Sequence, residues 1–333
     1  MNRDATPSRL DIGRIQAIRP PLLLGLIGGL ALAVIFGELP GRPLILHVLQ
    51  KLAHPSVFGI IALSVLVLAR QRASGGGPVW RDYLVALFAA ITVGGLTEIA
   101  QLFAHRDPSL RDVGLDTRGA IAALCLAAAF DARCRGAVRG AWWRALYLAA
   151  GLALAALILT PLAWTVAGYA NRSRRFPVLL EPASRLDLLF VSLGGSPSDR
   201  IPLPAAYARS PGETALRVPL LVRPVAGVWL DEPKSDWSGR QALLVDVTNP
   251  GRSTLELHVR VHDRSHNFKA DDRFNAVREI APGTRETLAF PLETIASAPT
   301  GRRLDLRHIA GLALFRVGAE GPREFWLQRI ELR

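Results

Sequence analysis

Polar side chains of types that can carry chemistry interrupt the most apolar part of the chain. Lys51 and His54 lie three residues apart near the start of one apolar stretch. Glu98 and Gln101 have the same spacing at the end of another. A short polar turn and the beginning of the next apolar stretch then supply Arg106, Ser109, Asp112 and Asp116. Residues three or four apart share one face of a helix. Because ionisable groups inside a membrane span are costly, such groups mark a candidate functional site.

The residue types of this set fit binding of an anionic head group together with proton transfer. Lys51, His54 and Arg106 would hold the anion, while Glu98 or Asp112 would move protons. Structural explanations also fit. Glu98 and Lys51 would form an ion pair between two helices, and Ser109 or Asp112 would cap the next helix.

Composition divides the chain into an apolar part and a polar part. Half of the 333 residues are hydrophobic, and the mean hydropathy is +0.24. Apolar residues are dense between positions 21 and 170 and diluted by charges afterwards. The net charge of +12 comes almost wholly from arginines. In the first half these flank apolar segments, which favours membrane topology and argues against nucleic acid as a partner. Two cysteines, Cys125 and Cys134, indicate no disulfide framework.

The apolar part predicts a membrane helical bundle of about five spans. After a cytoplasmic segment at residues 1–20, the spans are expected at 21–36, 49–69, 82–103, 112–130 and 145–170, within a transmembrane domain at 21–170. Eleven arginines flank the spans on one side and five basic residues on the other, which places the N-terminus in the cytoplasm. An odd number of spans then puts the C-terminal part outside the inner membrane, and the polar set at its outer face.

The C-terminal part predicts an all-β jelly-roll sandwich at residues 225–333. Apolar and polar residues alternate at 242–247, 254–261, 286–290 and 312–317, with proline–glycine turn signals between these runs. This period of two is typical of strands in a sandwich. Residues 171–224 are expected to form a linker and accessory strands, with 186–193 as one strand.

The polar positions between about 49 and 123 resemble those of the VanZ-like family of small bacterial membrane proteins. Lys51 and His54 match the family's Lys and His, Glu98 and Gln101 its Glu and Gln, and Gly119 its Gly. Arg106, Ser109 and Asp112 match the connecting turn. Asp116 stands where the family has Asn. The resemblance implies a multi-pass membrane protein, and in some members an association with glycopeptide-antibiotic resistance.

The segment from 225 to 333 is similar to galactose-binding-like jelly rolls of the carbohydrate-binding-module type. The residues that carry the resemblance lie at 237–250, 259–267, 271–275 and 304–315. It implies glycan binding, with these candidates: Trp237, His262, Asp263, Asp272, Arg273 and Asn275. Trp237 and Phe274 also fit a role in the sandwich core, and the Asp-Asp-Arg run fits a solvated loop. The sequence names no metal site and no cofactor.

Two functions from different classes therefore remain. One is a non-catalytic membrane protein that binds a cell-envelope lipid or glycan. The other is a membrane enzyme acting on a lipid-linked or cell-wall substrate through Lys51, His54, Glu98, Arg106 and Asp112. Substitution of Glu98 distinguishes them, since an enzyme would keep substrate affinity and lose turnover.

Overall fold

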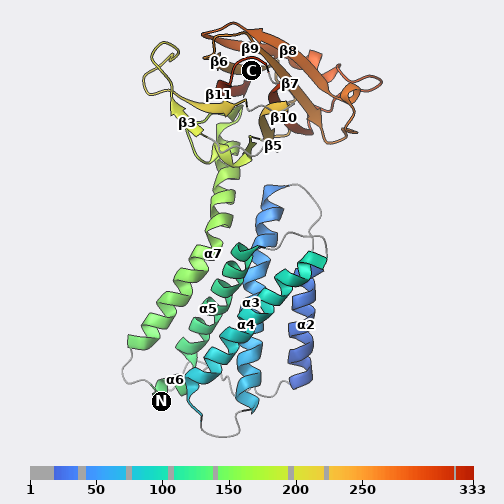
Figure 1. The fold of residues 1–333 in the computed structure, drawn as a ribbon. Coiled ribbons are helices and arrows are strands. Elements are labelled where there is room, and N and C mark those ends of the chain that lie inside the picture. The colour runs from blue at the N-terminus through green and yellow to red at the C-terminus, as the bar shows by residue number, and fades with distance from the viewer. Residues whose placement is uncertain are drawn as a thin grey trace, which may run out of the picture. The chain divides into compact units, whose positions relative to one another are not determined.

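A computed structural model describes residues 19–36, 43–72, 77–103, 109–137, 142–193, 199–220, 225–318 and 320–333 (Figure 1). The chain divides into two compact units, with the boundary between Ala163 and Trp164. The first unit is helical. The second consists mainly of two antiparallel sheets.

The described helices are α2 (Pro20–Phe36), α3 (Leu44–Arg72), α4 (Val79–Phe103), α5 (Leu110–Phe130), α6 (Ala132–Ala137), α7 (Trp142–Arg175) and the short α8 (Leu292–Ala296). Among them, α3, α4, α5 and α7 are long and apolar enough to cross a membrane. Helix α2 has 17 residues, about 25 Å at 1.5 Å per residue, and is somewhat shorter than the bilayer core. The predicted fold, a bundle of about five apolar helices followed by an all-β sandwich, is confirmed, with four long apolar helices and the shorter α2 ahead of the two sheets.

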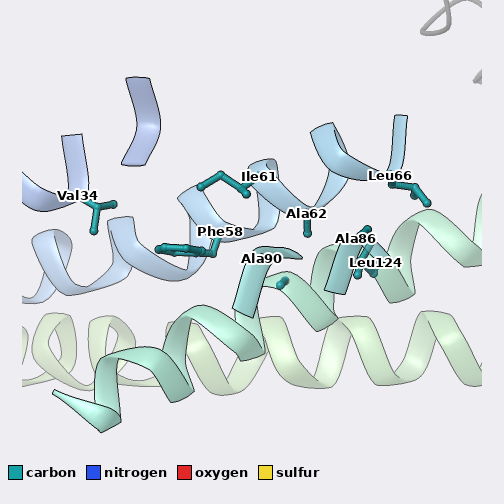
Figure 2. Close-up of a cluster of buried hydrophobic side chains, with 9 residues drawn as sticks. Val34, Phe58, Ile61, Ala62, Leu66, Ala86, Ala90 and Leu124 are labelled. Atoms are coloured by element: carbon teal, nitrogen blue, oxygen red, sulfur yellow. The ribbon is translucent and has the colours of Figure 1, made fainter. Parts of the chain in front are cut away.

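Aliphatic side chains, together with Phe58, form the interior of the helical bundle. Figure 2 shows the core, which includes Val34 from α2, Phe58 and Ile61 from α3, Ala90 from α4 and Leu124 from α5. Phe58 and Ile61 are wholly buried. Alanine and glycine on the facing helices allow this close packing, as is usual where helices associate within a membrane.

In the sandwich unit, the described residues form eleven strands in two sheets. They are β1 (Val178–Leu180), β2 (Val191–Ser192), β3 (Asp199–Pro202), β4 (Thr214–Pro219), β5 (Val225–Asp231), β6 (Ala242–Asn249), β7 (Leu255–Asp263), β8 (Phe274–Ile280), β9 (Thr284–Pro291), β10 (Ile309–Val317) and β11 (Glu324–Leu332). One sheet has the order β3-β4-β11-β6-β9, with β1 pairing β11. The other has the order β2-β5-β10-β7-β8. All pairings are antiparallel.

Alternating burial along the strands builds the sandwich core. In β7, Leu255, Leu257, Val259 and Val261 are buried, while the residues between them are more exposed. This is the period-two pattern expected of a sheet with one covered face. The four sequence runs read as strands correspond to β6, β7, β9 and β10.

Residues 171–224 contribute more to the sandwich than a linker would. Strands β1, β3 and β4 join the six-stranded sheet, and β2 pairs β5 in the other. The expectation of one strand at 186–193 is wrong. Asp187–Phe190 form a 3-10 turn before the two residues of β2, and Asp187 accepts hydrogen bonds from Asn171 and Arg175.

Candidate functional site

Three helices bring His54, Glu98 and Asp116 together; we call these residues the His54 cluster. Each offers one ligand atom, and these atoms all lie within 4.8 Å of one another. His54 Nδ1 is 3.6 Å from Asp116 Oδ1. Glu98 and Asp116 are 5% and 2% exposed. His54 Nδ1, Glu98 Oε1 and both carboxylate oxygens of Asp116 are buried, and the described part of the chain offers them no hydrogen-bond partner. An unpartnered buried charge is costly, so this arrangement points to a ligand.

Close backbone approach positions the cluster. A Cβ at Gly119 would lie 2.0 Å from the carbonyl oxygen of Pro55, so α3 and α5 can meet here only because residue 119 is a glycine. Pro55 follows His54 directly, and Gly119 lies three residues after Asp116. On α4, a Cβ at Gly94 would be 3.7 Å from Asp116 Oδ2. The glycines therefore let the three helices approach beside the polar groups.

A backbone hydrogen bond orients Glu98. The N–H of Ser109 donates to Glu98 Oε2 at 2.7 Å, which leaves Oε1 as the unpartnered oxygen. Gln101, one turn further along α4, is also buried. Ser109 occupies the N-cap position of α5, but its side chain makes no capping hydrogen bond. The contribution of Ser109 at this site is thus its backbone N–H.

The other predicted residues of the bundle lie around the cluster or beyond the described residues. The side chain of Lys51 is exposed, and no ion pair joins it to Glu98 within the described part of the chain. The structural ion pair considered for these two residues is therefore absent from this structure. Asp112 is half-buried in the first turn of α5, one turn before Asp116. Arg106 lies outside the described residues.

A second buried polar group in the bundle was not predicted from sequence. It consists of Arg70, Tyr83 and Asp131, which we call the Arg70 cluster. The Arg70 guanidinium pairs with Asp131, and the Tyr83 hydroxyl donates to Asp131 Oδ2 at 3.0 Å. The N–H of Arg133 donates to the other oxygen, Oδ1, at 3.0 Å. Both oxygens of this carboxylate are thus satisfied. In the sequence, Arg70 stands out only as one of the eleven arginines that flank the spans.

The structure separates the predicted glycan-binding residues of the sandwich into buried and surface positions. Trp237 is 0% exposed, and its indole Nε1 donates to the carbonyl of Lys234 at 2.7 Å. Its assignment as a sugar-stacking platform is therefore corrected to a core position. Phe274 is likewise buried and packs edge-on against Phe290.

Asp263 and Asp272 are occupied by an internal ion-pair network. The Arg302 guanidinium donates to Asp263 Oδ2 at 2.6 Å and Oδ1 at 2.9 Å, and it also pairs with Asp272. The hydrogen bond from Arg302, ahead of that from the Asn267 backbone N–H, lowers the pKa of Asp272 to about 2. These two carboxylates hold the β7–β8 connection against the loop before β10 and are not free for a ligand.

The remaining predicted residues are His262, Arg273 and Asn275. They lie on the outer face of the five-stranded sheet, together with residues that the sequence did not single out. The strand register places Trp229, Ala313, Arg260 and Asn275 in one row across β5, β10, β7 and β8. Residues directly opposite on antiparallel strands have their side chains on the same face.

The neighbouring positions add aromatic and imidazole groups to this face. His258 stacks on Phe315, with ring centroids 5.3 Å apart and planes 15° apart. His262 packs across Gly311, where a Cβ would lie 2.3 Å from the imidazole. Burial, ahead of the charge of Arg260, lowers the pKa of His262 to about 4. In the sequence, His258, Arg260 and His262 occur at every second residue. This is the spacing of side chains that share one face of a strand.

A polar hollow on the six-stranded sheet differs in character. It has a volume of about 570 Å³. Arg285 spans it, pairing with Glu213 at 2.5 Å and Asp246 at 2.6 Å, and Arg209 also contacts Asp246. None of its described lining residues is aromatic. Its central charges already satisfy one another, so it is a weaker candidate for a sugar site than the outer face of the other sheet.

Comparison with known proteins finds likeness only among solved structures. No family model matches the chain, and no curated protein matches it. The C-terminal β-sandwich is similar to the family 11 carbohydrate-binding module from Clostridium thermocellum solved with a β-1,3-1,4-mixed-linked tetrasaccharide. The identity is 16%, the TM-score 0.33, and the match covers 46% of this chain and 94% of the module.

Two further solved structures are similar. One is TmCBM61 in complex with β-1,4-galactotriose, at 11% identity and a TM-score of 0.28, covering 43% of this chain and 86% of that one. The other is an exo-β-agarase, at 15% identity and a TM-score of 0.35, covering 43% of this chain. The matched part corresponds to only 23% of the agarase.

Proposed function

We propose that this chain is a multi-pass membrane protein that binds a cell-envelope glycan through its β-sandwich. The observation that carries the proposal is the row that Trp229, Arg260 and Asn275 form across β5, β7 and β8, with Ala313 of β10 between the first two. Sugar sites combine aromatic faces with a few fixed hydrogen-bonding groups. Arg260 and nearby Arg273 make this face cationic, which favours a glycan that carries negative charge.

The experiment is affinity measurement with the full-length protein in nanodiscs against a panel of neutral and acidic envelope polysaccharides. Trp229→Ala should weaken binding about 10- to 30-fold, since loss of an aromatic anchor costs about 2 kcal/mol. Trp326→Ala is the matched control, because Trp326 is a half-buried indole on the six-stranded sheet. If the unaltered protein binds no polysaccharide, the sandwich is a spacer and the proposal fails.

We propose further that the bundle is a VanZ-like domain with its polar set at the outer face of the inner membrane and the N-terminus in the cytoplasm. The arginine bias and the buried carboxylates of the His54 cluster support this. In this arrangement the bundle binds membrane lipid or a lipid-linked sugar, and its place in the envelope fits a role in glycopeptide resistance. A reporter fused after Arg333 should be active only when exported. A cytoplasmic signal would overturn the orientation.

An enzyme acting on a lipid-linked or cell-wall substrate is the second candidate function. The observation that favours it is the set of unpartnered carboxylate oxygens on Glu98 and Asp116. Glu98→Gln should preserve expression and thermal stability, because glutamine keeps the shape of the side chain. It should abolish the phenotype that the protein confers on the cell, because it removes the charge of the carboxylate. If Glu98→Gln retains the full phenotype, Glu98 is not the proton-transfer group.

A further inference from the structure

We propose that the His54 cluster is a binding site for one divalent transition-metal ion of the Zn²⁺ class. An imidazole nitrogen and oxygens of two carboxylates converge from α3, α4 and α5 within 4.8 Å of one another. Nitrogen and carboxylate oxygen are both usual Zn²⁺ ligands. Mg²⁺ and Ca²⁺ favour oxygen ligands alone, so the imidazole argues for a transition metal. This inference does not depend on glycan binding by the sandwich.

The ligand spacing suits an ion better than a direct hydrogen bond. His54 Nδ1 and Asp116 Oδ1 are 3.6 Å apart, which is too long for a hydrogen bond between them. Two ligands of a tetrahedral ion, each about 2.0–2.2 Å from it, lie roughly 3.3–3.6 Å apart. The His54–Asp116 separation therefore leaves room for an ion that contacts both atoms.

Charge balance leads to the same ion. Glu98 and Asp116 are buried, and together they carry two negative charges when ionised. Among the described residues no Lys or Arg pairs with either of them, and the side chain of Lys51 is exposed. Buried charges persist when they are paired or coordinate a metal. A divalent cation would neutralise both carboxylates and give their unpartnered oxygens a bonding partner.

The surroundings of Glu98 resemble the outer shell of a metal site. The Ser109 N–H holds Glu98 Oε2 at 2.7 Å and so fixes the orientation of the carboxylate, whose other oxygen, Oε1, has no partner among the described residues. Hydrogen bonds of this kind orient metal ligands. Three protein ligands leave a fourth position of a tetrahedral ion free for a water or a substrate oxygen, as in catalytic Zn²⁺ sites. The proposed site is thus able to bind an exogenous ligand.

The test measures metal directly. The full-length protein is purified in detergent, equilibrated with Zn²⁺, freed of excess metal and assayed by mass spectrometry. About one ion per chain is expected for a single three-ligand site. His54→Ala and Asp116→Asn should each lower the affinity at least ~100-fold, since even outer-shell changes cost 10- to 100-fold. His47→Ala is the control, because His47 lies on the same helix with an exposed side chain.

Two further measurements keep the result decisive. Co²⁺ bound in place of Zn²⁺ should give visible d–d absorption in the unaltered protein and in His47→Ala, but not in His54→Ala. Asp116→Asn is nearly isosteric, so its circular dichroism establishes whether the variant is folded when its metal content is read. The proposal is overturned if the unaltered protein retains no more Zn²⁺ than His54→Ala. Equal metal loss in His47→Ala would overturn it as well.

Discussion

Two buried polar clusters lie at different levels of helix α3 (Leu44–Arg72), one near its middle and one at its C-terminal end, and they solve the same electrostatic problem differently. His54 and Arg70 are 16 residues apart on α3, about 24 Å at 1.5 Å per residue. In the Arg70 cluster, both oxygens of Asp131 accept hydrogen bonds. In the His54 cluster, neither oxygen of Asp116 accepts a hydrogen bond from any described residue. The comparison teaches that burial alone does not mark a ligand site; unfilled hydrogen-bonding capacity does.

The largest expected effect is on the Arg70 cluster. Asp131→Ala should lower the free energy of unfolding by about 3–5 kcal/mol, because Arg70 then stays buried without its partner. Thermal unfolding of the detergent-purified protein measures this. A double variant, Arg70→Met with Asp131→Leu, removes both charges and should recover much of the loss. If Asp131→Ala unfolds at the same temperature as the unaltered protein, the Arg70 cluster does not stabilise the fold. The contrast with the His54 cluster would then be wrong.

The next effect tests the backbone contact beside the His54 cluster. Gly119→Ala should cost about 3 kcal/mol, the upper end for overpacking, because its Cβ would meet the Pro55 carbonyl at 2.0 Å. Gly94→Ala is the matched control, since its nearest neighbour would be Phe58 at 3.5 Å, an ordinary contact. Gly119→Ala should also reduce metal retention, because it moves His54 away from Asp116. Equal unfolding temperatures for the two variants would contradict this role of Gly119.

The sign of the third effect distinguishes the two clusters. In metal-free protein, Asp116→Asn should stabilise the fold by about 1–3 kcal/mol, because it removes a buried charge whose oxygens have no partner. With Zn²⁺ present, the unaltered protein should regain the advantage by binding the ion. Unfolding curves with chelator and with Zn²⁺ provide the measurement. A destabilised Asp116→Asn under chelator would mean that Asp116 pairs with a protonated His54 instead.

Much of the helical unit could be predicted from local sequence, but the ligand set could not. Apolar length revealed the helices, and basic-residue bias placed His54, Glu98 and Asp116 at one end of the bundle. Their approach to within 4.8 Å depends on the Pro55–Gly119 contact, which joins residues 64 positions apart. No local pattern specifies such a contact, so the sequence offered Gly119 only as a match to the VanZ-like pattern.

The sandwich shows the same limit. Alternation revealed strands β6, β7, β9 and β10, yet the sequence left Trp237 open both as a core residue and as a glycan-binding residue. Its placement depends on residues far along the chain such as Leu306, whose carbonyl accepts its backbone N–H at 2.8 Å, and the sequence around it gives only a turn. Arg302 was missed as the partner of Asp263 and Asp272 because it lies 39 and 30 residues away from them. Trp229 was missed because β5 was not recognised as a strand.

The smallest expected effect applies the comparison to the sandwich. There Asp272 is ion-paired, whereas the buried Nδ1 of His262 has no hydrogen-bond partner among the described residues, and the two groups should respond to different pH ranges. Burial keeps His262 neutral in the folded state, with its pKa lowered from 6.5 to about 4. The unfolded chain therefore binds the proton first, and stability present above pH 6.5 is lost as pH falls towards about 4. For Asp272, whose pKa is lowered from 3.8 to about 2, stability present above pH 3.8 is lost only as pH falls towards about 2.

Thermal unfolding of the full-length protein between pH 7 and pH 3, followed by tryptophan fluorescence, separates the two contributions. His262→Gln should reduce the dependence of the melting temperature on pH between about pH 6.5 and 4. It should leave the steeper fall in melting temperature below pH 4 unchanged. His258→Gln is the control on the same strand face, where the imidazole lies 3.0 Å from Glu256. If His258→Gln reduces the pH dependence of the melting temperature in this range and His262→Gln does not, then His262 is not the group that the fold keeps neutral. The contrast between paired and unpartnered groups would then hold for the helical bundle alone.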